Sequence, residues 1–329
     1  MGSGRTLIAE ATHAQHLNVI HDPLELTAYP RWSVSAWQNL GGRRKQEDRL
    51  AICPVLDDSS AFFGLWDGTV DDFVVDEVKR QVLPNILKSE HWETYQALRE
   101  EGKGTATLDE QKTLQACLED AVLATDKDVL SKCRAVQNHY SSCTGVMVLL
   151  TNNVLTVANL GDSRAALGVA EDGVLRAEPL TVDHKPDQPV ERLRIEASGG
   201  AVQHVDSRDE RLMRAFLCGG DYTERKARGE NPKKLAYSRG FGGKDLKPYG
   251  LSSQPDVTQV VLDGRQKVLV MASDGLWDVC SEEKALFLAA DAADRDMDPA
   301  QVLVEFALAE HRIFRTKADN VTVIVVLLK

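Results

Sequence analysis

The chain has 329 residues, of which 43% are hydrophobic, so it can bury one large core or two modest ones. Its formal net charge is −11, with charges of both signs along its length, which excludes nucleic acid as the main partner because phosphate backbones bind to basic faces. No apolar stretch approaches the roughly 20 residues that a transmembrane helix needs.

The cysteines predict a reduced, intracellular protein, either cytoplasmic or nuclear. They are scattered and form no C-x-x-C pair, so neither a disulfide framework nor a zinc site is expected. The N-terminus lacks the apolar core of a secretory signal. Its Met-Gly-Ser-Gly-Arg-Thr start matches the loose pattern for N-myristoylation at Gly2, but a Met-Gly-Ser start is equally common in recombinant proteins. We expect a monomer by default.

The N-terminal half predicts an extension followed by the start of one large domain. Residues 1–30 have weak periodicity and form the extension, so the domain covers 31–329. Alternation predicts a strand over 32–40, and an apolar run predicts another that ends at Asp67. Spaced apolar residues predict a helix over 71–88, in which Pro84 would introduce a kink.

The middle of the chain predicts a long helix and then a cluster of strands. Thr107 and Glu110 have the spacing of a capping box, so the helix begins there. The strands that we expect next cover 144–150, 154–158 and 164–168, with Asn152-Asn153 as the first turn. A short helix over 189–198 then ends at Gly199-Gly200.

The C-terminal part predicts a flap, two helices and a buried strand. Residues 203–234 are polar and lack periodicity, which favours an active-site flap or insertion over a linker. Ser281 and Asp298 are expected to cap the two helices. Residues 321–328 are almost purely aliphatic and predict a central strand. Runs of strands separated by helices indicate an α+β fold.

Acidic residues recur at the ends of the predicted strands and in the turns between them. A single Asp-Gly step is an ordinary turn, but several carboxylates that converge would repel one another without a cation. Oxygen ligands of this kind suit Mg²⁺ or Mn²⁺ and not zinc. The acidic positions are Glu47, Asp48, Asp67, Asp162, Asp274 and Asp319.

In chain order, these motifs resemble the metal-dependent protein phosphatase 2C (PP2C) family of serine/threonine phosphatases over about residues 32–328. The motifs are Arg43 with Glu47-Asp48, Asp67-Gly68, Gly161-Asp162-Ser163-Arg164, Asp183-His184-Lys185-Pro186, Ser198-Gly199-Gly200, Tyr237-Ser238-Arg239-Gly240-Phe241-Gly242, Ser273-Asp274-Gly275 with Asp278, and Asp319-Asn320. The resemblance implies a four-layer α-β-β-α sandwich, in which two central antiparallel sheets are flanked by helices. It also implies a binuclear metal site at one end.

The resemblance implies a role for each acidic position. Asp67 would bridge two Mg²⁺ or Mn²⁺ ions. Asp274 and Asp319 would hold one of them, and Glu47 with the Gly68 carbonyl would hold the other. A third, weaker ion would bind to Asp162 and share Asp274. Two ions of this kind would neutralise phosphoryl oxygens and activate a water for in-line attack.

Other positions carry supporting roles. Arg43 would clamp the substrate phosphate, with Arg44 of the same turn as the alternative. Asp48 and Asp278 would contact metal-bound water, and the His184 motif is better explained as fold-defining than as catalytic. The family draws much of its specificity from surface inserts. We therefore expect substrate contacts in the flap, at Asp221, Arg225, Lys226 and Arg228.

The pattern breaks directly after the first metal motif. The family normally has a histidine there, assigned as the acid that protonates the leaving alkoxide, and this chain has Thr69. Threonine has no proton of suitable pKa to give near neutrality. Asp71 and Asp72 follow, and their charge would either strengthen a cation or discourage a phosphate.

Three functions compete on these grounds. The first is a metal-dependent phosphatase acting on phosphoserine and phosphothreonine in proteins, slowed on alkyl phosphates by the missing histidine. The second is a pseudophosphatase, a protein-binding module with little chemistry of its own. The third, a metal-dependent nuclease, fits the carboxylates but conflicts with the acidic surface charge.

Overall fold

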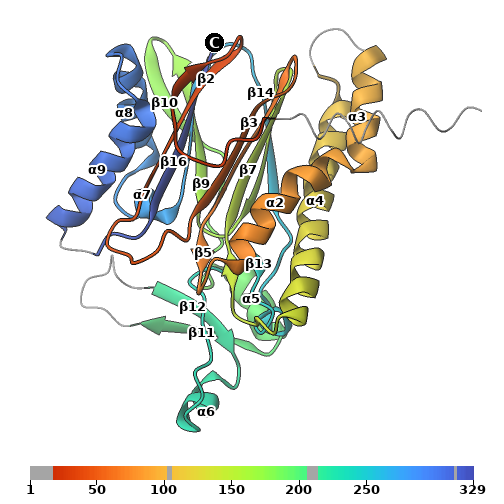
Figure 1. The fold of residues 1–329 in the computed structure, drawn as a ribbon, viewed down its shortest axis with the longest axis vertical. Coiled ribbons are helices and arrows are strands. Elements are labelled where there is room, and N and C mark those ends of the chain that lie inside the picture. Colours follow the sequence, from red (N-terminus) through yellow and green to blue (C-terminus); the bar gives the residue numbers. More distant parts are fainter. Residues whose placement is uncertain (1–17, 102–105, 206–213, 315–316) are drawn as a thin grey trace, which may run out of the picture.

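The structure is a computed structural model that describes residues 18–101, 106–205, 214–314 and 317–329. Gly2, the expected myristoylation site, lies outside these residues. Two antiparallel sheets stand face to face at the centre, and helices cover the outer face of each (Figure 1). This arrangement confirms the predicted α+β, four-layer sandwich.

The first sheet has six strands, and all of its pairings are antiparallel. Its order is β1 (Leu24–Ala28), β2 (Trp32–Asn39), β16 (Val321–Leu328), β15 (Gln266–Ala272), β9 (Arg164–Glu171) and β10 (Val174–Pro179). The aliphatic β16 is central, as predicted. The edge strand β1 lies within residues expected to be an N-terminal extension, and its half-exposed side chains explain the weak pattern.

The second sheet has five strands. Its order is β14 (Asp256–Val261), β8 (Val154–Leu160), β7 (Gly145–Thr151), β4 (Ser60–Trp66) and β3 (Arg49–Asp57). Apolar residues such as Phe63 and Leu65 of this sheet pack against Leu167 and Ile324 of the other in one buried cluster. This core holds the two sheets in a fixed relation, so the strand ends that carry the connecting loops are held in place.

The helices close the sandwich on both sides. Against the second sheet lie α2 (Phe73–Leu87), α3 (Glu90–Glu101) and α4 (Leu108–Ala135), and against the first lie α8 (Glu282–Asp294) and α9 (Pro299–Ile313). Thr107 begins α4 through a complete capping box with Glu110, as predicted. The sequence did not predict α3, because its mostly charged and polar residues show little apolar periodicity.

The segment predicted as a flap contains regular structure of its own. A hairpin of β11 (Gly200–Val205) and β12 (Arg214–Gly219) packs on α5 (Pro189–Ala197) and is followed by α6 (Tyr222–Ala227). These elements project beyond the end of the sandwich (Figure 1). The sequence predicted α5 but not the hairpin. Leu217 of β12 packs with Ile195 of α5 in a small apolar cluster separate from the main core, so the hairpin strands leave no clear periodic pattern in the sequence.

Two further expectations concern the chain as a whole. All six cysteines are free and buried. Among the residues that the structure describes, no helix is both long and apolar enough to cross a membrane.

Candidate active site

Acidic residues from separate parts of the chain meet at the end of the sandwich that faces the flap. Asp67 directly follows β4, and Asp162 follows β8. Asp274 opens the short helix α7 (Asp274–Trp277) directly after β15, and Asp319 precedes β16. The ends of strands from both sheets therefore carry the cluster, which gives each carboxylate a rigid support.

The cluster is electrostatically unfavourable as a set of free carboxylates. Burial, followed by repulsion from Asp48, Asp274, Asp319 and Asp162, raises the pKa of Asp67 well above its usual range. Burial and repulsion from Asp162, Asp278 and Asp319 raise the pKa of Asp274 in the same direction. These shifts follow from like charges held close in a poorly solvated place. A positive charge among these carboxylates would instead lower their pKa values.

Two carboxylate oxygens in the cluster are buried and have no hydrogen-bond partner, Oδ1 of Asp48 and Oδ1 of Asp274. The other oxygen of Asp48 accepts hydrogen bonds from Ser273 Oγ at 2.8 Å and Thr322 Oγ1 at 2.6 Å. Burial nevertheless raises the pKa of Asp48 to about 6. A buried acceptor without a partner is costly, so these oxygens are candidates to face a ligand.

Three basic side chains pair with carboxylates of the cluster. Arg43 forms an ion pair with Asp319, Lys185 with Asp162, and Arg214 with Asp278. Within the described ranges, no three His, Cys, Asp or Glu side chains surround one point closely enough to cage an ion. A cation bound by Asp319, Asp162 or Asp278 would compete with the basic groups paired to them.

The residues nevertheless fit hard divalent cations. Carboxylates dominate the donor set, and Mg²⁺ and Mn²⁺ prefer such oxygen ligands. The glycine of each Asp-Gly step is required by close backbone approach: a Cβ on Gly68 would lie 2.5 Å from the Glu47 carbonyl oxygen, and one on Gly275 would lie 2.1 Å from that of Asn320. Both turns therefore draw other parts of the chain against the carboxylates.

Asn320 positions the loop that carries Glu47, a role that the sequence did not reveal. Its Oδ1 accepts from the Glu47 amide at 2.8 Å, and its Nδ2 donates to the carbonyls of Leu40 and Lys45 at 3.0 Å each. Burial, opposed chiefly by Arg43, raises the pKa of Glu47. Asn320 follows Asp319 directly, so one turn supplies an acidic residue and holds another in place.

Arg43 and not Arg44 faces the carboxylates. Besides its pairing with Asp319, the Arg43 guanidinium is attracted by the negative charges of Asp67 and Asp274. Arg44 is exposed, and in the described part of the chain it forms no ion pair. The geometry thus brings the first of the two arginines to the acidic cluster.

Thr69 lies beside Asp67 in the short strand β5 (Gly68–Thr69), which pairs with β6 (Ser142–Cys143). Its Oγ1 accepts a hydrogen bond from the Tyr237 hydroxyl at 3.1 Å. Burial raises the pKa of Tyr237 well above its usual range, so the phenol keeps its proton near neutrality. The next residue, Val70, has a φ of 84°.

Asp71 and Asp72 are both engaged by the protein. Asp71 accepts from the Phe73 amide at 2.9 Å and from Asn138 Nδ2 at 3.0 Å. Asp72 lies 3.9 Å from a guanidinium nitrogen of Arg49. Their first role is therefore to start α2 and to balance Arg49.

His184 has a structural environment, in agreement with the prediction. The Gly161 amide donates to its Nδ1 at 3.0 Å, and its Nε2 is 3.1 Å from Oδ2 of Asp256. Both ring nitrogens are thus used to join the β8–β9 turn to β14. The side chain is buried and joins elements of the fold.

The flap residues named from the sequence do not join the acidic cluster. Arg225 pairs with Glu230 and Asp245, and Arg228 also pairs with Glu230. Asp221 precedes α6, and Lys226 Nζ lies 5.5 Å from the centre of the Tyr222 ring.

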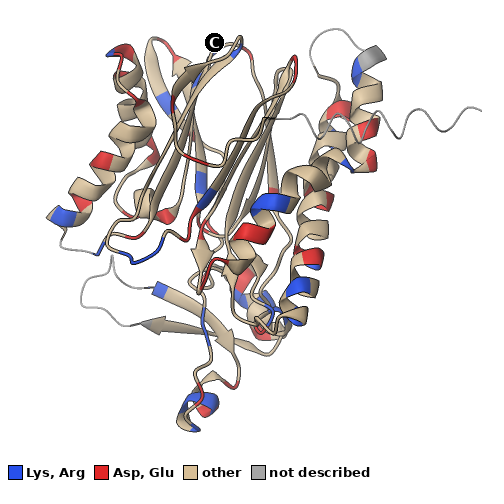
Figure 2. Cartoon of the chain, in the orientation of Figure 1, with Lys and Arg blue, Asp and Glu red and all other residues tan. Residues whose placement is uncertain are grey.

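Among the described residues of the flap, Arg214 at the start of β12 contacts the site, through Asp278. No local pattern could have identified it. Figure 2 shows basic residues on the flap and on the β2–β3 loop near this end of the sandwich.

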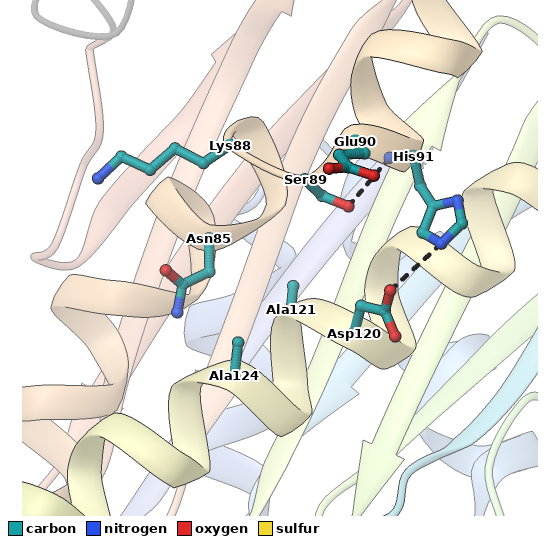
Figure 3. Close-up of a pocket in the computed structure, with 8 residues that line it drawn as sticks. All are labelled: Asn85, Lys88, Ser89, Glu90, His91, Asp120, Ala121 and Ala124. Carbon is teal, nitrogen blue, oxygen red and sulfur yellow. Dashed lines mark hydrogen bonds and ion pairs between the residues drawn. The ribbon is translucent and has the colours of Figure 1, made fainter.

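A separate hollow lies elsewhere on the molecule. It has a volume of about 330 Å³ and lies between the end of α2, the start of α3 and α4 (Figure 3). On its wall, Nε2 of His91 lies 3.2 Å from Oδ2 of Asp120. None of the acidic site residues lines it, so it is not part of the candidate site.

Comparisons with known proteins agree on one family. The family model described as protein phosphatase 2C matches residues 32–313. The chain is 30% identical over 273 residues to probable protein phosphatase 2C 72 of Arabidopsis thaliana, covering 81% of this chain and 76% of that protein. It is 33% identical over 301 residues to probable protein phosphatase 2C 48 of Oryza sativa subsp. japonica, covering 86% and 78% of the two chains.

Solved structures give the same result. The crystal structure of serine-threonine phosphatase 2C from Toxoplasma gondii matches with a TM-score of 0.88 and 40% identity, over 95% of this chain and 100% of that one. A second phosphatase of T. gondii matches with a TM-score of 0.65 at 19% identity, over 94% and 96% of the two chains, which supports the fold alone.

Proposed function

The chain belongs to the protein phosphatase 2C family of serine/threonine phosphatases, and on that premise we propose that it hydrolyses phosphoserine and phosphothreonine in proteins with two Mg²⁺ or Mn²⁺ ions. The convergence of five carboxylates beside Arg43, two of them with a buried oxygen that lacks a partner, is the observation that carries this proposal. The acidic surface charge disfavours a nuclease.

The carboxylates would hold the ions. Asp67 would contact both, Asp274 and Asp319 one, and Glu47 with the Gly68 carbonyl the other. Asp162 would contribute to a third, weaker site. The ions would supply charge neutralisation for the phosphate and acidify a water for attack on phosphorus.

The basic and polar residues would handle the substrate. Arg43 already stands among the carboxylates, so its guanidinium would turn from Asp319 to the phosphate once a cation takes its place. Asp48 and Asp278 would hold water through their remaining oxygens. The outer surface of the flap, with Asp221, Arg225, Lys226 and Arg228, would contact the protein around the phosphorylated residue.

A pseudophosphatase is the alternative, and Thr69 in place of histidine is the observation that favours it. General acid catalysis is worth about 10²–10⁴-fold, so its loss slows an enzyme without abolishing it. The phosphate clamp and the acidic cluster do not depend on position 69. We therefore favour a phosphatase with reduced turnover of alkyl esters.

Hydrolysis of p-nitrophenyl phosphate and of a phosphothreonine peptide, each with Mn²⁺ and with a chelator, tests the proposal. We expect Mn²⁺ to stimulate both reactions, with the aryl ester favoured because its leaving group needs less protonation. Asp274→Asn should abolish the stimulation. Folded wild-type protein that shows no metal-stimulated turnover of either substrate would establish the pseudophosphatase instead.

A further inference from the structure

The Thr69 hydroxyl stands at the end of a buried hydrogen-bond chain. Ser142 Oγ lies 2.8 Å from the Tyr237 hydroxyl, which donates to Thr69 Oγ1 at 3.1 Å. Ser142 is fully buried and Tyr237 is 4% exposed, whereas Thr69 is only partly buried beside Asp67 and Gly68. The chain therefore runs from the interior toward the acidic cluster.

The chain has one direction. The Tyr237 phenol has a single proton and gives it to Thr69, so Ser142 must be the donor to Tyr237. The Thr69 oxygen therefore accepts a hydrogen bond from Tyr237 on its interior side. The proton of the Thr69 hydroxyl takes no part in this hydrogen bond. Among the described residues, no group accepts that proton. It remains available for a group in the site.

Packing fixes the position of the phenol. A Cβ on Gly240 would lie 2.9 Å from Cε2 of Tyr237, so the ring is seated where only glycine leaves room. The ring belongs to the apolar cluster under the flap, together with Leu217 and Leu235. Thr69 and Ser142, the two ends of the hydrogen-bond chain, lie directly opposite each other in the β5–β6 ladder. All three hydroxyls are therefore held by backbone or core.

Resting on the proposed phosphatase function, we propose that Tyr237 is a positioning residue that directs the Thr69 hydroxyl proton at the oxygen leaving phosphorus. The bond from phosphorus to that oxygen breaks, and its electron pair stays on the oxygen. Thr69 stabilises the oxygen by a hydrogen bond and keeps its own proton. One water is consumed: its oxygen ends on phosphorus, and the proton that the leaving oxygen gains comes through solvent.

The effect should depend on the leaving group. A hydrogen bond to a developing negative charge is worth about 10- to 100-fold in rate. An alkyl leaving group carries most of that charge on oxygen, whereas a nitrophenyl group spreads it over the ring. Loss of the Thr69 hydrogen bond should therefore slow the phosphothreonine peptide and leave the aryl ester nearly unchanged.

Tyr237→Phe and Thr69→Val test the inference, with Thr69→Ser as the conservative variant and Tyr95→Phe as the matched control. Tyr95 is also buried but lies in α3. With Mn²⁺, we expect Tyr237→Phe and Thr69→Val to lower kcat for the peptide by about tenfold and kcat for p-nitrophenyl phosphate by less than about twofold. Tyr95→Phe should resemble wild type, and Thr69→Ser, which keeps the hydroxyl, should restore the peptide rate that Thr69→Val loses. Tyr237→Phe should add little to Thr69→Val, because it acts through Thr69.

The outcomes separate this inference from the proposed function. A wild type that hydrolyses neither ester overturns the proposed function and this inference with it. An active wild type whose Tyr237→Phe variant slows neither ester, or slows both equally, overturns the inference alone. Unfolding curves and Mn²⁺ titration calorimetry on each variant identify damage to the fold or to the metal site. If Tyr237→Phe shows such damage, Ser142→Ala is a second variant that shortens the hydrogen-bond chain.

Discussion

At position 70, a β-branched residue holds a left-handed backbone conformation, with φ at 84° and a side chain that is 43% exposed. Such a conformation costs on the order of 1–3 kcal/mol for a residue other than glycine. The strain lies one residue after Thr69, at the point where β5 ends and the chain turns into α2. The surrounding contacts of Asp71 hold the turn in place.

We expect Val70→Gly to raise the free energy of unfolding by about 1 kcal/mol, because relief of the strain exceeds the entropy that glycine adds to the unfolded chain. Urea unfolding at neutral pH measures it. Val174→Gly is the control: Val174 is also exposed but starts a regular strand, so the change should destabilise by about 0.5–1 kcal/mol. Equal destabilisation by both would show that position 70 is not strained.

The β11–β12 hairpin brings a positively charged side chain of the flap, Arg214, to the acidic cluster. Its only described contact of this kind is Arg214 with Asp278, and the charges of Asp274, Asp162 and Asp319 also act on this guanidinium. A divalent cation near Asp278 would compete with it. The hairpin and the proposed metal site would thus be coupled through one arginine.

Arg214→Gln should tighten Mn²⁺ binding by about two- to fivefold, since a partly exposed ion pair contributes up to about 1 kcal/mol. Titration calorimetry gives the affinity directly. Arg176→Gln removes a comparable surface pairing, with Glu171, from the edge strand β10 and should leave the affinity unchanged. Weaker binding in the Arg214 variant would mean that the arginine orders the ligands instead of competing with the ion.

Across the whole molecule, a buried ionic network ties the flap base to the sandwich. Glu191 of α5 pairs with Arg194 and Arg239, and it also accepts from Ser238. Arg239 continues to Asp256 in β14. Burial alone would raise the pKa of Glu191, but the hydrogen bonds from these partners outweigh it and hold the pKa at about 2 instead of 4.5.

A carboxylate whose pKa is lowered by folding adds stability above its unfolded pKa and loses it on acidification. For Glu191 the loss should occur between pH 4.5 and about 2. Glu191→Gln should therefore lower the free energy of unfolding by about 2–3 kcal/mol at pH 7 and flatten the acid limb below pH 5. Urea unfolding across this range measures both.

The exposed Glu196 on the same helix is the matched control, and Glu196→Gln should change stability by less than about 0.5 kcal/mol. A wild-type acid limb that persists in full in the Glu191 variant would assign the pH dependence to other groups.

The sequence by itself determined the elements whose signals are local. Helix caps act within three or four residues, so Thr107, Ser281 and Asp298 marked their helices correctly. The aliphatic run of β16 and the order of the acidic motifs likewise needed no partner to be recognised. The absence of histidine at position 69 was also visible from the sequence alone.

Only the tertiary structure decided which groups meet. Arg43 reaches Asp319 across 276 residues, Tyr237 reaches Thr69 across 168, and Arg214 reaches Asp278 across 64. A contact between distant residues depends on the packing of whole sheets and on the β11–β12 hairpin of the flap, and a local pattern contains neither. For this reason the sequence identified the carboxylates, whereas only the fold showed which arginine side chains and hydroxyl groups lie at the site.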